Sequence, residues 1–218
     1  STIVGSQTDI SVTDYEIAVF DNRFSALSAS PPDIKNIKDV IVNQSYGYCE
    51  VISYSPDHKI NLYSLKNEQI MLLMKVWSDR FIKLMKDPNI KYVLPFENRG
   101  KEIGVTLDHP HGQIYGLNEI PSIIHKQACK QKEKLIVTNL VHSINNDLKI
   151  SNNDNAISFV PPFARYPFEI WIAPFKKVDH VEFLNNEEIN SMAKLLKSSI
   201  KRLDILFKKP MAYTMAVH

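Results

Sequence analysis

Residues 106–115 read TLDHPHGQIY, and this stretch contains two of the seven histidines of the chain. His109 and His111 are one residue apart, and Gln113 follows at the same spacing. Side chains at i, i+2 and i+4 of a β-strand point to one face of the sheet. The spacing therefore predicts a polar row of two imidazoles and an amide. Pro110 has no backbone N–H, which predicts that the strand ends here or lies at an edge.

Two imidazoles beside a neutral amide are compatible with three kinds of chemistry. The histidines could bind a metal, could act as a base and its orienting partner, or could include a nucleophile. Gly112 would let a phosphate group approach the backbone between them. A pair of hydrogen-bonded histidines without a catalytic role is the plainer alternative, and residues 106–115 alone do not decide among these.

The composition indicates a folded protein with neither a membrane nor a nucleic acid as partner. The chain has 218 residues, of which 44% are hydrophobic and 23% charged, and its net charge is +2. This length can bury one sizeable core or two small ones. We expect no nucleic-acid partner because the sequence has no long basic run. We expect no membrane partner because no apolar run approaches the roughly 18–20 residues of a membrane span.

The cysteines and the first residues bear on the compartment. Cys49 and Cys129 lie far apart and form no CxxC pair, and STIVGSQTDI lacks the basic and apolar regions of a signal peptide. We therefore expect reduced cysteines and a cytoplasmic location.

Hydrophobic periodicity predicts alternating strands and helices. Strands are expected at residues 14–24, 49–56 and 91–100, with residues 103–107 leading into the histidine stretch. Apolar residues at helical spacing predict a helix over residues 66–86, with Asn67 as its N-cap. Residues 117–150 are expected to be helical in part, and loops are expected at residues 28–36 and 151–155.

The second half of the chain repeats the pattern of the first. Glu50-Val51-Ile52 aligns with Glu169-Ile170-Trp171 at an offset of 119 residues, and the same offset places Asn67 on Asn186. Apolar positions of the two helices also coincide, although any two strand–helix–strand units share some periodicity. We interpret the pattern as a duplication and predict an α+β fold of two half-units, each an antiparallel sheet with a packed helix.

The duplication sets the expected domain boundaries. The first unit is predicted to cover residues 1–125 and to carry the histidine strand, and the second to cover residues 126–218. At the same offset, the counterpart of the histidine strand would lie beyond His218. We therefore expect the second unit to lack its last strand, so that the chain is either a fragment or is completed by another chain.

Five segments in order resemble the galactose-1-phosphate uridylyltransferase family, a nucleotidyltransferase branch of the histidine-triad superfamily. They are VFDNRFSAL (19–27), CEVISYSPDHKINLYSL (49–65), FENRGKEIGVTLDHPHGQIYG (96–116), VPPFARYPFEIWIAPFKKVDHVEFL (160–184) and LDILFKKPMAYTMAVH (203–218). Together they cover nearly the whole chain. The resemblance implies tandem histidine-triad-like units and a homodimer whose active site borrows C-terminal residues from the partner.

The family that these segments resemble transfers a uridylyl group in two steps. The second histidine of HPHGQ attacks the α-phosphorus of UDP-glucose, glucose 1-phosphate leaves, and galactose 1-phosphate then takes the uridylyl group from the histidine. The resemblance assigns this nucleophile to His111 and implies a backbone carbonyl at its other ring nitrogen. Gln113 stands where hydrolase branches have a third histidine, and it would donate to a phosphoryl oxygen without adding charge.

The resemblance also assigns nucleotide contacts. Positions that contact the nucleotide and its phosphates match Asn98, Gly104, Val105 and Thr106. The uridine end matches Phe20, Asn22 and Arg23. Better-known members have Asp at the position of Arg23. Phe20 as a core residue and Asn22 as a turn residue are the plainer alternatives.

Metal ligands of the family are present only in part. Many members hold a structural zinc with a CxxC pair, the histidine of SPDH and the first histidine of HPH. The two histidines are His58 and His109 here, and the CxxC pair is absent from the sequence. Two imidazoles fall short of the four ligands of a closed zinc site, so we expect zinc only if other residues complete it. An iron-type site of some relatives matches His218 alone, because Gln127 stands at its acidic position.

The sequence leaves two other functions open. A sister nucleotidyltransferase with the same fold would use an ADP-sugar or a dinucleoside polyphosphate, and HPHGQ does not distinguish these substrates. A truncated nucleotide-binding protein without activity is the non-enzymatic alternative, and the missing CxxC pair and missing strand favour it.

Overall fold

The computed structural model of the protein describes residues 15–35, 37–105 and 109–218. The chain divides into two compact units. The first consists of the described residues up to Ile60, Asp79–Ile120 and Ala212–His218, and the second of Asn61–Ser78 and Pro121–Met211. The boundary between residues 125 and 126 that the duplication suggests stays a prediction.

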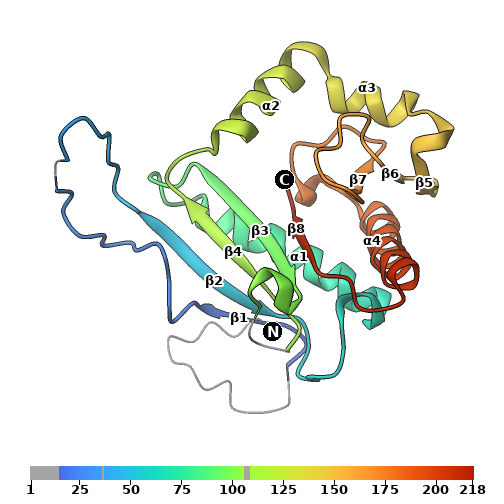
Figure 1. Cartoon of the computed structure of the whole chain (residues 1–218), viewed down its shortest axis with the longest axis horizontal. Coiled ribbons are helices and arrows are strands. Elements are labelled where there is room, and N and C mark those ends of the chain that lie inside the picture. Colours follow the sequence, from blue (N-terminus) through green and yellow to red (C-terminus); the bar gives the residue numbers. More distant parts are fainter. Residues whose placement is uncertain (1–14, 36, 106–108) are drawn as a thin grey trace. The chain divides into compact units, whose positions relative to one another are not determined.

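The first unit contains a five-stranded antiparallel sheet. In spatial order its strands are β1 (Ala18–Asp21), β2 (Gly47–Ser53), β4 (His111–Leu117), β3 (Tyr92–Arg99) and β8 (Tyr213–Ala216). Figure 1 shows β2, β4 and β3 side by side, with β8 along the outer edge of β3. The histidine stretch therefore begins the central strand of this sheet.

The two faces of this sheet differ in burial. Residues of β4 alternate between half-buried and buried, as expected for a strand with one covered face. The covered face packs against the last residues of helix α1 (Asn67–Leu84). There Arg80 forms an ion pair with Glu50 of β2, with Nε 2.8 Å from Oε2, and both residues are buried. The other face carries His111 and Gln113.

The second unit contains a three-stranded antiparallel sheet of β5 (Lys149–Asn152), β6 (Ala156–Phe159) and β7 (Trp171–Pro174). Helices α2 (Ser122–Lys134), α3 (Ile136–Ser143) and α4 (Asn186–Phe207) belong to the same unit. Val141 of α3 forms a buried cluster with Ile157 and Phe159 of β6. Helix α4 is hydrogen-bonded to the β5–β6 turn, because the side-chain amide of Asn155 in the turn donates to Ser191 Oγ of α4 at 3.0 Å. All four residues of β6 are buried.

Four short 3-10 helices complete the described secondary structure, namely η1 (Leu62–Ser64), η2 (Lys101–Ile103), η3 (Asn146–Leu148) and η4 (Val181–Phe183). Two of them precede the long helices at the offset of 119 residues that the sequence suggests. Leu62 and Asn67 begin η1 and α1, and Val181 and Asn186 begin η4 and α4. The start of the 3-10 helix and the start of the long helix are thus the same number of residues apart in both halves.

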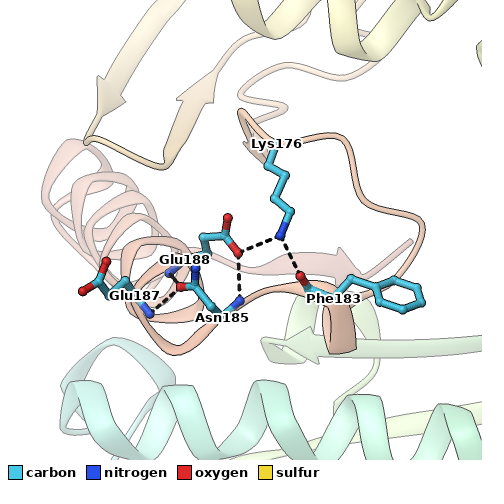
Figure 2. A network of polar contacts seen from close by, with 5 residues as sticks. All are labelled: Lys176, Phe183, Asn185, Glu187 and Glu188. Atoms are coloured by element: carbon cyan, nitrogen blue, oxygen red, sulfur yellow. Dashed lines mark hydrogen bonds and ion pairs between the residues drawn. The ribbon is translucent and has the colours of Figure 1, made fainter.

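The polar groups at these helix starts are not the same. Asn185 caps α4 and forms a capping box with Glu188, whose carboxylate also accepts from Lys176 (Figure 2). In α1 the first helical hydrogen bond runs from the amide of Ile70 to the carbonyl of Lys66. Lys66 therefore precedes the first turn, and the prediction of Asn67 as the N-cap is wrong. The Asn67 side chain donates instead to Asn190.

The main sequence predictions are confirmed. The fold is α+β, the expected strands form β1, β2 and β3, and the helix predicted over residues 66–86 is α1. The loop predicted at residues 151–155 is wrong in part, because Ser151 and Asn152 pair with β6 and only the turn after them is irregular. No helix within the described ranges is long and apolar enough to cross a membrane.

Candidate active site

A cavity of about 190 Å³ lies at the start of β4, within the first unit. Its lining contains five of the residues that the sequence singles out together with two neighbours. These residues are Asn98, Ile103, Gly104, Val105, His111, Gly112 and Gln113. The structure thus brings the predicted nucleophile, the predicted phosphoryl donor and three predicted nucleotide contacts to one place. Thr106, the remaining phosphate contact, lies outside the described residues.

His111 is the first residue of β4 and is half-buried. Its Nδ1 lies 2.7 Å from the carbonyl oxygen of His109. A carbonyl only accepts hydrogen bonds, so Nδ1 carries the proton and Nε2 keeps a free lone pair in the neutral ring. The backbone two residues upstream therefore fixes the tautomer that a nitrogen nucleophile needs.

His109 does not belong to the strand, because β4 begins at His111. The predicted row of three side chains on one strand is therefore correct only for His111 and Gln113. Pro110 ends the ladder as predicted, and its carbonyl accepts from the amide of Tyr54 at 3.2 Å. The proline thus marks the end of a central strand and not an edge.

Two amide side chains reach the cavity from neighbouring strands. Gln113 lies on β4 and Asn98 near the end of β3, and the oxygen of each amide accepts a hydroxyl hydrogen bond. An amide whose oxygen is engaged offers its N–H groups to other acceptors. Both residues are therefore suited to donate to oxygens of a phosphate without bringing a positive charge.

Gly104 closes the turn that follows β3. It ends η2 with φ of 85°, a left-handed conformation that glycine adopts without strain, and its amide donates to Lys101. A side chain at Gly104 would meet no atom within 4 Å. The turn therefore presents bare backbone next to the side chain of the adjacent Val105, which leaves room for a bulky anionic group.

The residues predicted for the uridine end lie in or just after β1, which is separated from β4 by β2. Phe20 is paired with Val51 and Val51 with Gln113, so these three side chains share the half-exposed face of the sheet. Asn22 donates to the oxygen of Gln113 at 3.4 Å. Arg23 is exposed and its guanidinium lies 5.9 Å from the centre of the Phe24 ring. Asn22 thus connects to the cavity residues directly, and Phe20 only through the sheet.

Gly112 is required by the covered face of the sheet. A Cβ at this position would lie 2.1 Å from the hydroxyl of Tyr54 and 2.8 Å from the carbonyl oxygen of Phe96. The glycine therefore admits a buried tyrosine directly beneath the strand that carries His111. This packing explains the glycine between His111 and Gln113, whereas the predicted approach of a phosphate to it stays a prediction.

A buried carboxyl group lies near Tyr54 on that face. Glu97 is 5% exposed and accepts a hydrogen bond from the hydroxyl of Tyr213 at 2.9 Å. Burial raises the pKa of Glu97 to about 7, and the hydrogen bonds from Tyr213 and Tyr54 and the charge of Arg99 offset only part of that rise. The covered face thus holds a carboxyl group that titrates near neutral pH.

The two predicted zinc ligands meet in the structure. The Nδ1 atoms of His58 and His109 are 2.7 Å apart, and the other ring nitrogen of His109 lies 2.8 Å from Ser53 Oγ. Burial, and then the neighbouring His58, lower the pKa of His109. No third His, Cys, Asp or Glu joins this pair among the residues that the structure describes. The described residues therefore supply two of the four ligands of a closed zinc site and do not fit the metal by themselves.

His218 lies apart from this pair. Its ring stacks on Tyr92, whose hydroxyl is hydrogen-bonded to the Nδ1 atom of the histidine. Burial lowers the pKa of His218. Within the described parts of the chain, no metal-binding group of three or more residues includes it.

Sequence reasoning missed several residues that support the cavity. Tyr115 and Thr214 donate to the two amides, and Tyr54 packs against Gly112. Only Tyr115 had a local signal, since it continues the alternation of His111 and Gln113 by one more step. Thr214 lies on β8, and no local pattern connects it to β3.

Comparisons with known proteins show which proteins the chain resembles. Residues 4–121 match the model of the galactose-1-phosphate uridyl transferase N-terminal domain. A galactose-1-phosphate uridylyltransferase of Thermotoga maritima is 32% identical over 210 residues, which cover 93% of this chain and 66% of that protein. One of Streptomyces lividans is 28% identical over 215 residues, 94% of this chain and 56% of that protein. A solved uridylyltransferase structure superposes with a TM-score of 0.87 at 27% identity, over 94% of this chain and 68% of that one.

The lengths of these proteins differ from that of the chain. The matches span 66% and 56% of the two curated relatives, so each relative contains a further part with no counterpart among the matched residues. The family model covers the first sheet up to the end of β4, which is the part that carries the cavity.

Proposed function

The chain belongs to the galactose-1-phosphate uridyl transferase family, and on that premise we propose that it transfers a uridylyl group from UDP-glucose to galactose 1-phosphate through a covalent intermediate on His111. The observation that carries the proposal is the ring of His111 beside a polar cavity, with its Nδ1 bound to the carbonyl of His109. That hydrogen bond leaves Nε2 as the nucleophile.

The first half-reaction makes and breaks one bond to phosphorus. The Nε2 lone pair of His111 attacks the α-phosphorus of UDP-glucose, and the bond between that phosphorus and the bridging oxygen breaks. Glucose 1-phosphate leaves with the electron pair, and a uridylyl-histidine remains. The ring becomes cationic as the N–P bond forms. The proton stays on Nδ1, and its hydrogen bond to the carbonyl oxygen of His109 stabilises the developing charge.

The second half-reaction reverses the first with a new acceptor. A phosphate oxygen of galactose 1-phosphate attacks the phosphorus, the N–P bond breaks, and the electron pair returns to Nε2. UDP-galactose leaves, and His111 is neutral again. Splitting the transfer in two means that one phosphate-binding site serves both sugar phosphates in turn.

The cavity residues would stabilise the phosphoryl oxygens. Gln113 and Asn98, which line the cavity together with His111, would donate amide hydrogens, and neither changes its charge during the reaction. Gly104 leaves space for the oxygens at the turn. Neutral donors suit a transfer between two sugar phosphates, because a fixed cation would also hold the leaving phosphate and slow its exchange.

The uridine end would lie along the half-exposed face toward β1. We propose Phe20 as an apolar platform for the base and Asn22 as a hydrogen-bonding residue next to Gln113. Arg23, exposed beside Phe24, would contact the ribose or the solvent-facing edge of the base.

The proposal also includes a homodimer and a zinc ion. Sedimentation of the purified chain would test the homodimer. His58 and His109 would bind the zinc ion together with ligands from other residues. No step of the transfer uses this metal.

The central test is covalent labelling. The chain is incubated with UDP-glucose radiolabelled at the α-phosphate, quenched in base, and analysed for protein-bound label that is released by acid, as a phosphoramidate is. We expect label on the wild-type chain and none on His111→Ala. His125→Ala, which removes an exposed histidine of α2, serves as the matched control and should be labelled normally.

The outcomes separate the proposal from its alternatives. Label that survives His111→Ala contradicts the assigned nucleophile. Label from ADP-glucose or a dinucleoside polyphosphate in place of UDP-glucose identifies a sister nucleotidyltransferase. Binding of UDP-glucose without label identifies a nucleotide-binding protein that does not catalyse the transfer.

A further inference from the structure

The orientation of the two cavity amides depends on which end of each amide is held by the protein. An amide presents two N–H donors on its nitrogen and an acceptor on its oxygen. Only the nitrogen end attracts a phosphoryl oxygen, whereas the oxygen end repels it. The catalytic value of Gln113 and Asn98 therefore rests on groups that hold their oxygens away from the phosphate.

The oxygen of Gln113 is held by two donors. Tyr115, two residues further along β4, donates its hydroxyl to Gln113 Oε1 at 3.2 Å, and Asn22 donates its amide at 3.4 Å. The Asn22 amide is itself oriented, because its oxygen accepts from the backbone N–H of Phe24 at 3.0 Å. Burial raises the pKa of Tyr115, which keeps its hydroxyl protonated and able to donate. With its oxygen taken, Gln113 has only its N–H groups left for the cavity.

The oxygen of Asn98 is held by a residue of the neighbouring edge strand, β8. Thr214 of β8 donates its hydroxyl to Asn98 Oδ1 at 2.9 Å, and the two residues are direct partners in the β3–β8 register. Direct partners in an antiparallel ladder project from the same face, so the contact follows from the register itself. Asn98 is thus oriented in the same way as Gln113, by a hydroxyl on a neighbouring position of the sheet.

We propose that Tyr115 and Thr214 are positioning residues, whose hydroxyl groups hold the oxygens of Gln113 and Asn98 so that both amides aim their N–H groups at the transferred phosphoryl group. The inference rests on the proposed uridylyl transfer for its substrate. It adds two residues that do not line the cavity and that would act through the amides.

The two hydroxyls should not contribute equally. Tyr115 is half-buried, whereas Thr214 is exposed and shares Asn98 with solvent. A net hydrogen bond corresponds to a factor of about two to ten in an equilibrium constant, with the larger values where water competes less. We therefore expect about a fivefold to tenfold effect at Tyr115 and about a twofold to threefold effect at Thr214.

The experiment compares a nucleotide with its nucleoside. Dissociation constants are measured for UMP and uridine, and in parallel for AMP and adenosine, on the full chain carrying Tyr115→Phe, Thr214→Val or Thr214→Ser. The ratio of nucleoside to nucleotide dissociation constants reports on the phosphoryl group alone. We expect Tyr115→Phe and Thr214→Val to lower this ratio by the factors given above, to leave nucleoside binding unchanged, and to slow labelling of His111 similarly. Thr214→Ser keeps the hydroxyl and should match the wild type.

Matched variants remove hydroxyls of residues that do not line the cavity. Tyr48→Phe deletes a hydroxyl that donates to Asp87, and Thr138→Val deletes one that accepts from Gln131. Both should keep the wild-type ratio. A general loss of structure would weaken nucleoside and nucleotide binding together, so equal weakening in Tyr115→Phe contradicts the inference. It is equally contradicted by an unchanged ratio, by a serine variant that behaves like valine, or by a wild-type chain whose ratio is one.

This design separates the two proposals. If the wild type binds UMP more tightly than uridine but takes no label from UDP-glucose, the uridylyl transfer is wrong while the orientation of the amides is still measured. If label appears at the wild-type rate in Tyr115→Phe and Thr214→Val with unchanged ratios, the transfer stands and the positioning role is wrong.

Discussion

The two antiparallel sheets share a plan but differ in what covers them. In the first, β4 alternates between buried and half-buried residues, and the half-buried face carries His111 and Gln113. In the second, all four residues of β6 are buried, and Ile157 and Phe159 form a cluster with Val141 of α3. The polar row of His111 and Gln113 thus lies on the half-buried face of the first sheet, and among its described residues the second sheet has no strand that alternates in this way.

The covered faces also differ in chemistry. The covered face of the first sheet contains two buried carboxyl groups, Glu50 with Arg80 and Glu97 with Tyr213. The corresponding cluster of the second sheet is apolar and is built around Ile157 and Phe159. Stability of the first sheet should therefore depend on charge and pH, and that of the second on packed volume.

Breaking the buried ion pair should have the largest effect. Arg80→Met leaves the Glu50 carboxylate buried without its partner, and we expect the free energy of unfolding to fall by about 3–5 kcal/mol in urea titrations. The double variant Glu50→Gln/Arg80→Met removes both charges and should recover most of the loss. Lys83→Met breaks an exposed pair with Asp79 on the same helix and should cost less than about 0.5 kcal/mol. Equal losses in the single and double variants would contradict a role for the unpaired charge.

Creating a cavity in the second sheet should rank next. Ile157→Ala removes three carbons from a residue that is 1% exposed, and we expect a loss of about 3–4 kcal/mol that does not vary with pH. Trp171, which borders the same cluster, provides a fluorescence signal for unfolding. Ile205→Ala, at a position that is 64% exposed, is the control and should change stability little. A similar loss at both isoleucines would argue against a packed core around β6.

Glu97 should make the first sheet sensitive to pH. Because burial raises its pKa from the model-peptide value of 4.5 to about 7, the folded state holds a proton that the unfolded state releases. Stability is therefore highest below about pH 4.5, falls as pH rises toward 7, and levels off above. The fall should reach about 3 kcal/mol, since each pKa unit corresponds to about 1.4 kcal/mol.

Glu97→Gln isolates this contribution. The difference in unfolding free energy between the wild type and this variant, measured from pH 4.5 to pH 8, should change by up to about 3 kcal/mol in favour of the variant. Glu182→Gln removes an exposed carboxylate and serves as the control. A difference that stays constant over this range would show that Glu97 is ionised in the folded protein at low pH.

The start of α4 should give the smallest effect. Asn185→Ala removes the side chain that caps two backbone amides in Figure 2, and we expect a loss of about 1 kcal/mol in thermal or urea unfolding. Asn186→Ala, at the next and exposed position, should cost a few tenths of that. If the two variants lose the same amount, the cap does not distinguish this helix start from that of α1.

Local patterns predicted what depends on neighbours in the sequence. The alternation of His111 and Gln113 placed both on one face of a strand, and periodicity placed β3 and α1 within a few residues. The family resemblance selected Asn98, Gly104 and Val105, which the fold brings to the same cavity. These successes share one cause, since side-chain direction along a strand or helix is fixed by its period.

Features that depend on register or on competing partners were not predictable in this way. Thr214 reaches Asn98 only because β8 pairs with β3 in one particular register, and 116 residues separate the two in the sequence. Asn67 has the composition of a helix cap, but its side chain donates to Asn190. Glu97 occupies an inward strand position where a charged residue is not expected, and its partners there, Tyr213, Arg99 and Tyr54, come from other positions of the fold.

The late position of β8 has a consequence for how the protein is made. Glu97 on β3 and Tyr213 on β8 are 116 residues apart, so at about 5–20 residues per second the ribosome needs roughly 6–23 seconds to deliver the strand that pairs with β3. During that interval β3 is an open edge, which could pair with the wrong chain. Pro95 lies in the middle of that edge, where its carbonyl later accepts from the amide of Val217. Since the N–H and C=O of a strand residue point to the same side, the proline leaves this edge one donor short while the nascent chain waits for its own β8.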